Sequence, residues 1–176
     1  TSPVRIGKLA YLRRGALRRR ISSVPNRQHH RSLPFRIYAI TDRKVLTKGT
    51  SLVQAAADLL VAAPAGRVAL QLRDKDLPQA ERAELARQLR AITRRHGALL
   101  LINGDLELAT SCGADGIHFA DGHPGLQQMS ATERGWGRDR LWVGASCHDR
   151  AGIERAQTFG ADFIALSPVQ PSPGKA

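Results

Sequence analysis

The sequence predicts an α/β fold of the TIM (β/α)8-barrel type that is incomplete, with about six βα units. Short apolar runs alternate with helix-forming segments along most of the chain, and the runs are apolar at consecutive positions. Such runs are typical of strands buried on both faces, and strict βα alternation indicates a parallel sheet. No G-x-G-x-x-G pattern follows the first run, which disfavours a dinucleotide-binding, doubly wound sheet.

Six strands and five helices are expected in the folded part of the chain. The strands are expected at Arg36–Thr41, Arg67–Arg73, Ala98–Asn103, Asp115–Phe119, Leu141–Ser146 and Asp162–Ser167. The helices, rich in Ala, Leu, Glu, Arg and Gln, are expected at Ser51–Ala63, Pro78–Arg95, Asp105–Cys112, Pro124–Arg134 and Asp149–Phe159.

One unit of the chain is repeated. The sequence GADGI at Gly113–Ile117 returns as GADFI at Gly160–Ile164, 47 residues later. In each copy a glycine ends a predicted helix and Ala-Asp leads into a predicted strand, as glycine capping of a helix C-terminus would require. An offset of this size fits two βα units, so the repeat supports the barrel-type fold.

The chain divides into a basic extension, residues 1–35, and a βα-barrel domain, residues 36–176. The extension holds nine basic residues and no acidic one, whereas the remainder holds 18 basic and 15 acidic residues. The formal charge of +12 therefore belongs mostly to the extension. A complete barrel needs about 200 residues or more. We therefore expect the last two βα units to be missing, from a fragment, a shortened copy or a chain completed by a partner such as a homo-oligomer.

The extension has three interpretations. We expect disorder, and the alternatives are an organelle transit peptide or a short amphipathic helix with one apolar face: Ile6, Leu9, Leu12 and Leu17. Nucleic-acid contact is not expected, because the folded part is nearly balanced in charge. No membrane span is expected, because no run of about 18 apolar residues is present. With two cysteines the chain resembles a protein of a reducing compartment, so we expect a cytoplasmic location unless the extension targets an organelle.

Polar residues gather at the carboxyl ends of the predicted strands. Gln71, Arg73 and Lys75 follow one another at spacing two, so their side chains should point the same way. Amide and cationic groups on an inward face are costly unless an anion binds there. Asn103 and Ser146 end two other strands and His118 lies near the end of a further one, and polar residues at this end of a barrel indicate an active site. The alternative for the two cations is a surface ion pair with the neighbouring aspartates.

A set of motifs, in order, resembles the thiamine phosphate synthase family and its thiazole tautomerase relatives, most closely the type found fused behind Nudix hydrolases. The motifs are Tyr38–Arg43, Gln71–Asp76, Ile102–Asp105, Gly113–His118, Gly144–His148 and Gly160–Val169. Each motif is weak alone, but the ordered set covers residues 36–176. The resemblance implies a barrel that joins an aminopyrimidine methyl diphosphate to a thiazole phosphate, releases diphosphate and uses Mg²⁺.

The resemblance also implies roles for the strand-end residues. Arg73 and Lys75 match the family's diphosphate-binding cations, while Gln71 and Asn103 match groups that hold the pyrimidine and the diphosphate. Ser146 matches the serine near the diphosphate and the reacting carbon. Ser146 and Lys75 are therefore the catalytic candidates, and all five residues are candidates for substrate binding.

The metal site departs from the family pattern. The synthases carry metal-binding aspartates at two positions where this chain has Gly104 and His123. Asp105 and Asp121 are the nearby candidate ligands for Mg²⁺. Asp105 is equally suited to cap the following helix, which is the interpretation we favour. His118 and His123 have a spacing that allows a metal pair, but we expect a structural His118 and a solvent-exposed His123.

Three functional hypotheses concern the folded part, and a further rival is nucleic-acid or membrane-surface association through the basic extension, with the barrel as passenger. The leading one is thiamine phosphate synthesis from small phosphorylated pyrimidine and thiazole substrates, and the alternatives are thiazole tautomerase-like isomerisation and non-catalytic binding of a phosphorylated metabolite. The tautomerase relatives carry a histidine in the loop where this chain has Pro168, which counts against isomerisation. In the same loop Ser172 and Lys175 match a threonine and a lysine of the synthases and are further substrate-binding candidates, although an ordinary loop explains them equally well.

Overall fold

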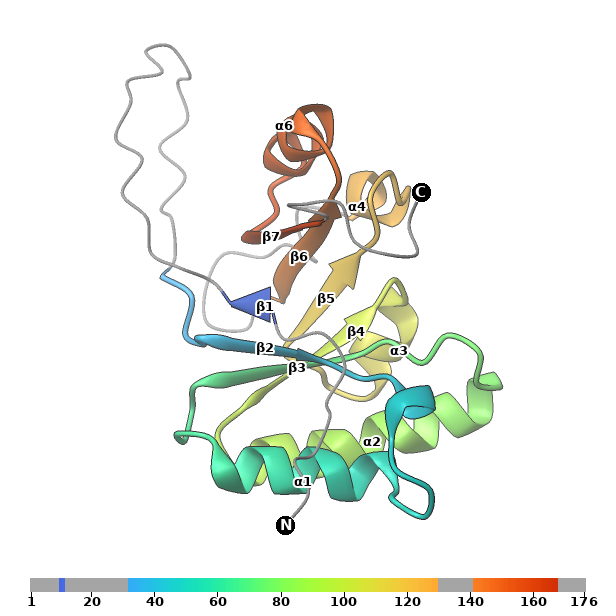
Figure 1. Cartoon of the computed structure of the whole chain (residues 1–176). Coiled ribbons are helices and arrows are strands. Elements are labelled where there is room, and N and C mark those ends of the chain that lie inside the picture. Colours follow the sequence, from blue (N-terminus) through green and yellow to red (C-terminus); the bar gives the residue numbers. More distant parts are fainter. Residues whose placement is uncertain (1–9, 12–31, 130–140, 168–176) are drawn as a thin grey trace.

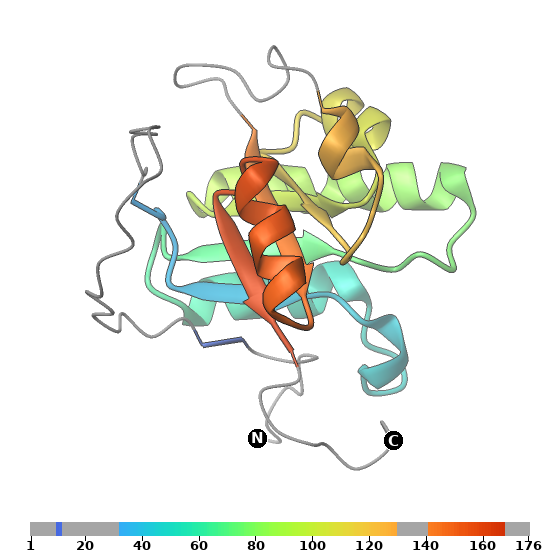
Figure 2. The same cartoon turned by 90° about the horizontal axis from the view of Figure 1, so that it is seen from above.

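The computed structural model describes residues 10–11, 32–129 and 141–167 of the chain. Six parallel strands lie in one sheet in sequence order: β2 (Ile37–Ile40), β3 (Val68–Leu72), β4 (Leu99–Asn103), β5 (Gly116–Phe119), β6 (Trp142–Cys147) and β7 (Phe163–Leu166). Strand order without a reversal belongs to the barrel type and not to a doubly wound sheet. The sheet curls into a half-barrel with the helices on its outer side (Figures 1 and 2). The predicted incomplete barrel is confirmed.

The segments between the strands are helical. They are the short 3₁₀ helix η1 (Arg43–Val45) and the helices α1 (Leu52–Ala62), α2 (Gln79–Arg95), α3 (Leu106–Ser111), α4 (Gly125–Gln128) and α6 (Arg150–Thr158). The predicted helix over Pro124–Arg134 does not continue through Met129. Met129 has φ −57° and ψ 122°, which is not helical, so α4 stops at Gln128, and residues 130–140 lie outside the described part.

The amino-terminal boundary also differs from the prediction. Strand β1 (Ala10–Tyr11) pairs antiparallel with β2, although we expected disorder there, or a helix. The outer edge of β2 explains this pairing, because an edge strand offers unpaired backbone groups. Phe35 is buried and its ring packs against Tyr38 and Phe163, so the core begins before residue 36. Residues 1–9 and 12–31 of the basic extension lie outside the described part of the chain.

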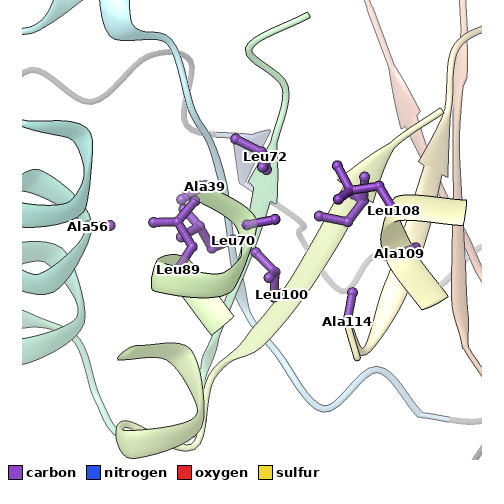
Figure 3. Close-up of a cluster of buried hydrophobic side chains, with 11 residues drawn as sticks. Ala39, Ala56, Leu70, Leu72, Leu89, Leu100, Leu108, Ala109 and Ala114 are labelled. Atoms are coloured by element: carbon purple, nitrogen blue, oxygen red, sulfur yellow. The ribbon is translucent and has the colours of Figure 1, made fainter. Parts of the chain in front are cut away.

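The outer face of the sheet is held by aliphatic packing. Leu70 and Leu72 of β3 meet Leu89 of α2 in one buried cluster (Figure 3). The other members of this cluster are Ala39, Ala56, Ala86, Leu100, Ile102, Leu108, Ala109 and Ala114. A fully buried leucine contributes about 2 kcal/mol, so this layer fixes which side of β3 turns outward. By alternation, Ala69 and Gln71 turn inward.

The repeated Gly-Ala-Asp motif has the same structural role in both copies. Asp115 accepts the backbone N–H of Leu100 at 2.8 Å, and Asp162 accepts that of Val143 at 2.9 Å. Each aspartate thereby ties the start of its strand to the preceding strand. The two glycines have φ 63° and 76°, a left-handed conformation that ends the helix just before the motif.

The structure bears on two expectations, the free cysteines and the lack of a membrane-spanning helix. Cys112 is half-buried and Cys147 is buried, and both are free thiols. In the three described ranges, no helix combines the length and the apolar character that crossing a membrane requires.

Candidate functional site

Four polar side chains line the inner face of the half-barrel near the carboxyl ends of its strands. They are Gln71 of β3, Asn103 of β4, His118 of β5 and Ser146 of β6. Gln71, Asn103 and His118 are buried and Ser146 is half-buried. The register pairs Asn103 with His118, and His118 with Gly144, which precedes Ser146 by two residues. The structure thus places the predicted residues Gln71, Asn103 and Ser146 at the same end of one face.

His118 connects these side chains through hydrogen bonds. Its Nδ1 lies 3.0 Å from the hydroxyl of Tyr38, which donates to Gln71 Oε1 at 3.0 Å. Its Nε2 lies 2.9 Å from Ser146 Oγ. Tyr38 was not among the predicted site residues, although alternation along β2 could have placed it on the inner face. His118 was counted among the polar residues at the strand ends, but a structural role was expected for it.

The imidazole of His118 stays uncharged near neutral pH. Burial, followed by the positive charges of Arg73 and Lys75, lowers the pKa of His118 from 6.5 to about 4. Burial also raises the pKa of Tyr38, so the phenol keeps its proton. The hydrogen-bonded group of Gln71, Tyr38, His118 and Ser146 is therefore neutral, and the charge at this end of the sheet comes from the loop after β3.

The loop after β3 is anchored by a buried carboxylate. Asp74 accepts hydrogen bonds from Thr41 Oγ1 at 2.5 Å, from the backbone N–H of Arg43 at 3.0 Å and from Arg43 Nε at 3.1 Å. Thr41 Oγ1 accepts the backbone N–H of Arg73 at 2.9 Å. The exposed Asp76 is paired with Arg43 and Lys44. Residues that follow β2 thus neutralise both aspartates of this loop.

Arg73 and Lys75 are therefore left without an aspartate of their own loop as an ion-pair partner. Both are exposed, and among the described residues neither forms an ion pair with Asp74 or Asp76. The surface ion pair that was the alternative for these cations is absent from this part of the chain. Their positive charges also contribute to the lowered pKa of His118. Two cations without an aspartate partner, close to a group of neutral polar side chains, are an arrangement that favours an anion.

Asn103 adds an unused acceptor to this site. Its Nδ2 donates to the backbone carbonyl of His118 at 3.4 Å, but its Oδ1 is buried without a partner among the described residues. An unpaired buried acceptor costs about 1–3 kcal/mol. A hydrogen-bond donor on a ligand, such as an aromatic amine, would remove that cost.

The carboxylates expected to bind Mg²⁺ already have other partners. Asp105 caps α3 by accepting the N–H of Leu108 at 2.9 Å, and its other oxygen pairs with Arg82. Asp121 pairs with Arg155 at 2.9 Å, which lowers the pKa of Asp121. Within the described ranges, no group of three or more His, Cys, Asp or Glu side chains is arranged to hold a metal ion. As they stand, these residues do not fit a resident metal, and magnesium stays a prediction.

The two positions that depart from the family's metal site are neighbours in space. A Cβ added to Gly104 would lie 3.4 Å from His123 Nε2. The His123 ring lies 5.3 Å from that of Phe119, and its Nδ1 accepts the N–H of Gly125. His123 is therefore half-buried and not solvent-exposed as predicted. Its position is fixed by its own loop.

Some predicted site residues fall outside the described part. Ser172 and Lys175 lie beyond residue 167, as does Pro168, on which the argument against isomerisation rests. Their roles stay predictions. The site that the structure does describe extends from Tyr38 on β2 to Ser146 on β6.

A parallel half-barrel with cations and polar groups at the carboxyl ends of its strands defines a βα-barrel protein, and that end is where such barrels carry their functional sites. The family model of thiamine monophosphate synthase matches residues 37–176, and the chain belongs to that family. The resemblance seen in the motifs is confirmed.

Individual relatives agree with this assignment. A thiamine-phosphate synthase of Thiobacillus denitrificans is 35% identical over 146 residues, which cover 82% of this chain and 65% of that protein. One of Thioalkalivibrio sulfidiphilus is 43% identical over 109 residues, covering 60% of this chain and 49% of that protein. A thiamine phosphate pyrophosphorylase structure from Pyrococcus furiosus superimposes with a TM-score of 0.63 at 27% identity, over 76% of this chain and 60% of the other. The chain thus spans about half to two thirds of these relatives.

Proposed function

We propose that this chain takes part in thiamine phosphate synthesis, joining an aminopyrimidine methyl diphosphate to a thiazole phosphate with release of diphosphate. The observation that carries the proposal is the pair of cations, Arg73 and Lys75, beside the neutral polar side chains of the inner face. A leaving diphosphate needs positive charge at one end, and a pyrimidine needs hydrogen-bonding groups at the other. This site has both the positive charge and the hydrogen-bonding groups at the carboxyl ends of neighbouring strands.

Each of these residues has its own role in the proposed reaction. The bond between the methylene carbon and the diphosphate oxygen breaks, the electron pair leaves with diphosphate, and the thiazole nitrogen then donates its lone pair to the carbon. Arg73 and Lys75 stabilise the charge that develops on the departing group. The free Oδ1 of Asn103 accepts from the pyrimidine amine, and Gln71 contacts the same ring. Ser146 faces the carbon that turns positive.

Magnesium has no assigned step in this proposal. The Mg²⁺ that the family resemblance implies would neutralise diphosphate oxygens, and it would be held through one or two carboxylates and the substrate itself. Asp105 and Asp121 would have to leave Arg82 and Arg155 to serve. The chain's own cations are therefore the groups on which the proposal depends.

The test is a coupling assay on the full chain with both phosphorylated substrates, with and without Mg²⁺. We expect thiamine phosphate to form, and turnover to fall when Arg73→Ala and Lys75→Ala are combined. Arg87→Ala is the matched control, because Arg87 is an exposed cation of α2 already paired with Glu84. Turnover that survives the double substitution would refute the site.

Non-catalytic binding of a phosphorylated metabolite is the second candidate. The pairing of Asp105 with Arg82 and of Asp121 with Arg155 favours it, because neither carboxylate is ready to assist a reaction. The same variants separate the candidates. A binder takes up inorganic pyrophosphate through Arg73 and Lys75 but forms no thiamine phosphate under any metal condition.

A further inference from the structure

We propose that Tyr38 and His118 act as positioning residues that fix the hydroxyl proton of Ser146, so that Ser146 presents only oxygen lone pairs to the opening of the site. The hydrogen bonds that connect these residues are present in the structure. Their consequence for catalysis rests on the proposed function. Four strands contribute, since Gln71, Tyr38, His118 and Ser146 lie on β3, β2, β5 and β6. We call these four residues the relay.

The direction of each hydrogen bond follows from counting protons. Gln71 Oε1 only accepts, so the hydroxyl of Tyr38, 3.0 Å away, donates its single proton to it. The oxygen of Tyr38 must then accept from His118 Nδ1, also at 3.0 Å. His118 therefore carries a proton on Nδ1.

The other ring nitrogen completes the assignment. A neutral imidazole has one N–H, so with Nδ1 protonated, Nε2 is an acceptor. Ser146 Oγ lies 2.9 Å from Nε2 and must donate to it. The charged groups that act on the ring are Arg73 and Lys75, which oppose a second proton, and the remaining groups that face it, Tyr38 and Ser146, are uncharged.

The His118 ring is closely packed against β6 and β7. A Cβ at Gly144 would lie 2.6 Å from His118 Nδ1 and 2.4 Å from the ring of Phe163, so only glycine leaves room for His118 there. Phe163 also packs against Tyr38 at a centroid distance of 5.1 Å and against His118 at 5.9 Å. Because the ring is closely packed, its two nitrogens keep Tyr38 and Ser146 as hydrogen-bond partners.

The consequence concerns the carbon that loses diphosphate. A serine that donated to the substrate would place a partial positive charge beside a carbon that is itself becoming positive. With its proton held by His118, Ser146 instead offers the negative end of its dipole. The relay thus assigns Ser146 to the carbon and leaves the diphosphate to Arg73 and Lys75.

The first measurement is the tautomer of His118, determined by ¹⁵N-edited NMR of the imidazoles in the full chain and assigned with His118→Asn. We expect a protonated Nδ1 and an unprotonated Nε2 at neutral pH. Tyr38→Phe should shift the population toward Nε2–H, because Nδ1–H loses its acceptor. Tyr11→Phe, which changes the chain's other tyrosine, should leave the tautomer as it is. An Nε2–H ring in the wild type, or no change in Tyr38→Phe, would overturn the relay.

The second measurement is steady-state turnover. We expect Tyr38→Phe to lower kcat about tenfold with little change in KM, the scale of one lost hydrogen bond. Ser146→Ala should lower kcat while leaving the tautomer of His118 intact, since Tyr38 still holds Nδ1–H. An inactive wild type with the expected tautomer would refute the proposed function but not the relay. An active wild type whose kcat is insensitive to Tyr38→Phe would refute the positioning role.

Discussion

The loops that follow β3 and β5 both carry acids that are paired with cations of another segment, but only the loop after β3 also carries cations of its own, Arg73 and Lys75. After β3, Asp74 and Asp76 are neutralised by Arg43 and Lys44, which belong to another segment, and the loop's own cations stay free. After β5, Asp121 is neutralised by Arg155 of α6. The comparison teaches that a loop keeps a net positive charge when it has cations of its own and its acids are paired with another segment.

Asp74 gives the largest expected effect. Asp74→Asn removes a buried carboxylate that accepts from Thr41 and twice from Arg43. We expect the free energy of unfolding to fall by about 3 kcal/mol, the scale of breaking a buried ion pair. Urea denaturation measures this change. Asp76→Asn is the matched control, because Asp76 is exposed and its pairs should contribute under about 1 kcal/mol. Equal losses in the two variants would contradict the distinction.

The free and paired cations can be compared directly. Removing Arg73 and Lys75 together should weaken binding of inorganic pyrophosphate about 100-fold, because each charge-assisted contact is worth roughly tenfold. Arg155→Ala should change the affinity less than about twofold, since that guanidinium is committed to Asp121. Isothermal titration calorimetry at fixed ionic strength gives both values. A larger effect from Arg155 would reverse the roles of the two loops.

Sequence patterns predicted the part of this molecule that depends on local rules. Alternation placed Gln71 inward opposite Leu70 and Leu72, and the capping preference of aspartate predicted the role of Asp105 at the start of α3. Contacts between distant segments were beyond those rules. The bond from Tyr38 to His118 spans 80 residues, and nothing near Tyr38 in the sequence indicates its partner.

The same distinction explains the partners of the acidic residues. A pair with the neighbouring Arg73 was the alternative that the sequence left open for Asp74, whereas the fold supplies Arg43, 31 residues away. Asp121 finds Arg155 at a separation of 34 residues. Local sequence therefore placed the candidate residues Gln71, Asn103 and Ser146 at one end of the sheet, but the free or paired state of each charge needed the tertiary structure.

A pH titration tests whether His118 stays uncharged in the folded protein. The pKa of His118 falls from 6.5 in the unfolded chain to about 4 in the folded protein, so between these values the unfolded state binds more protons. Stability is therefore complete above pH 6.5 and falls as the pH drops toward 4. Between pH 7 and pH 5 we expect the wild type to lose about 2 kcal/mol more than His118→Asn in urea unfolding. Equal losses would show that His118 takes up a proton freely in the folded state.

The smallest expected effect separates the two interpretations of Asp105. As a helix cap, Asp105→Ala should lower the free energy of unfolding by about 1 kcal/mol, while Asp105→Ser should retain most of it because serine also caps helices well. As a magnesium ligand, Asp105 would tolerate neither change, and both variants would lose whatever Mg²⁺ adds to pyrophosphate affinity. Its contacts with Leu108 and Arg82 favour the first outcome. Stable Asp105→Ser protein that has lost a magnesium-dependent gain in affinity would instead show that Asp105 leaves Arg82 when diphosphate binds.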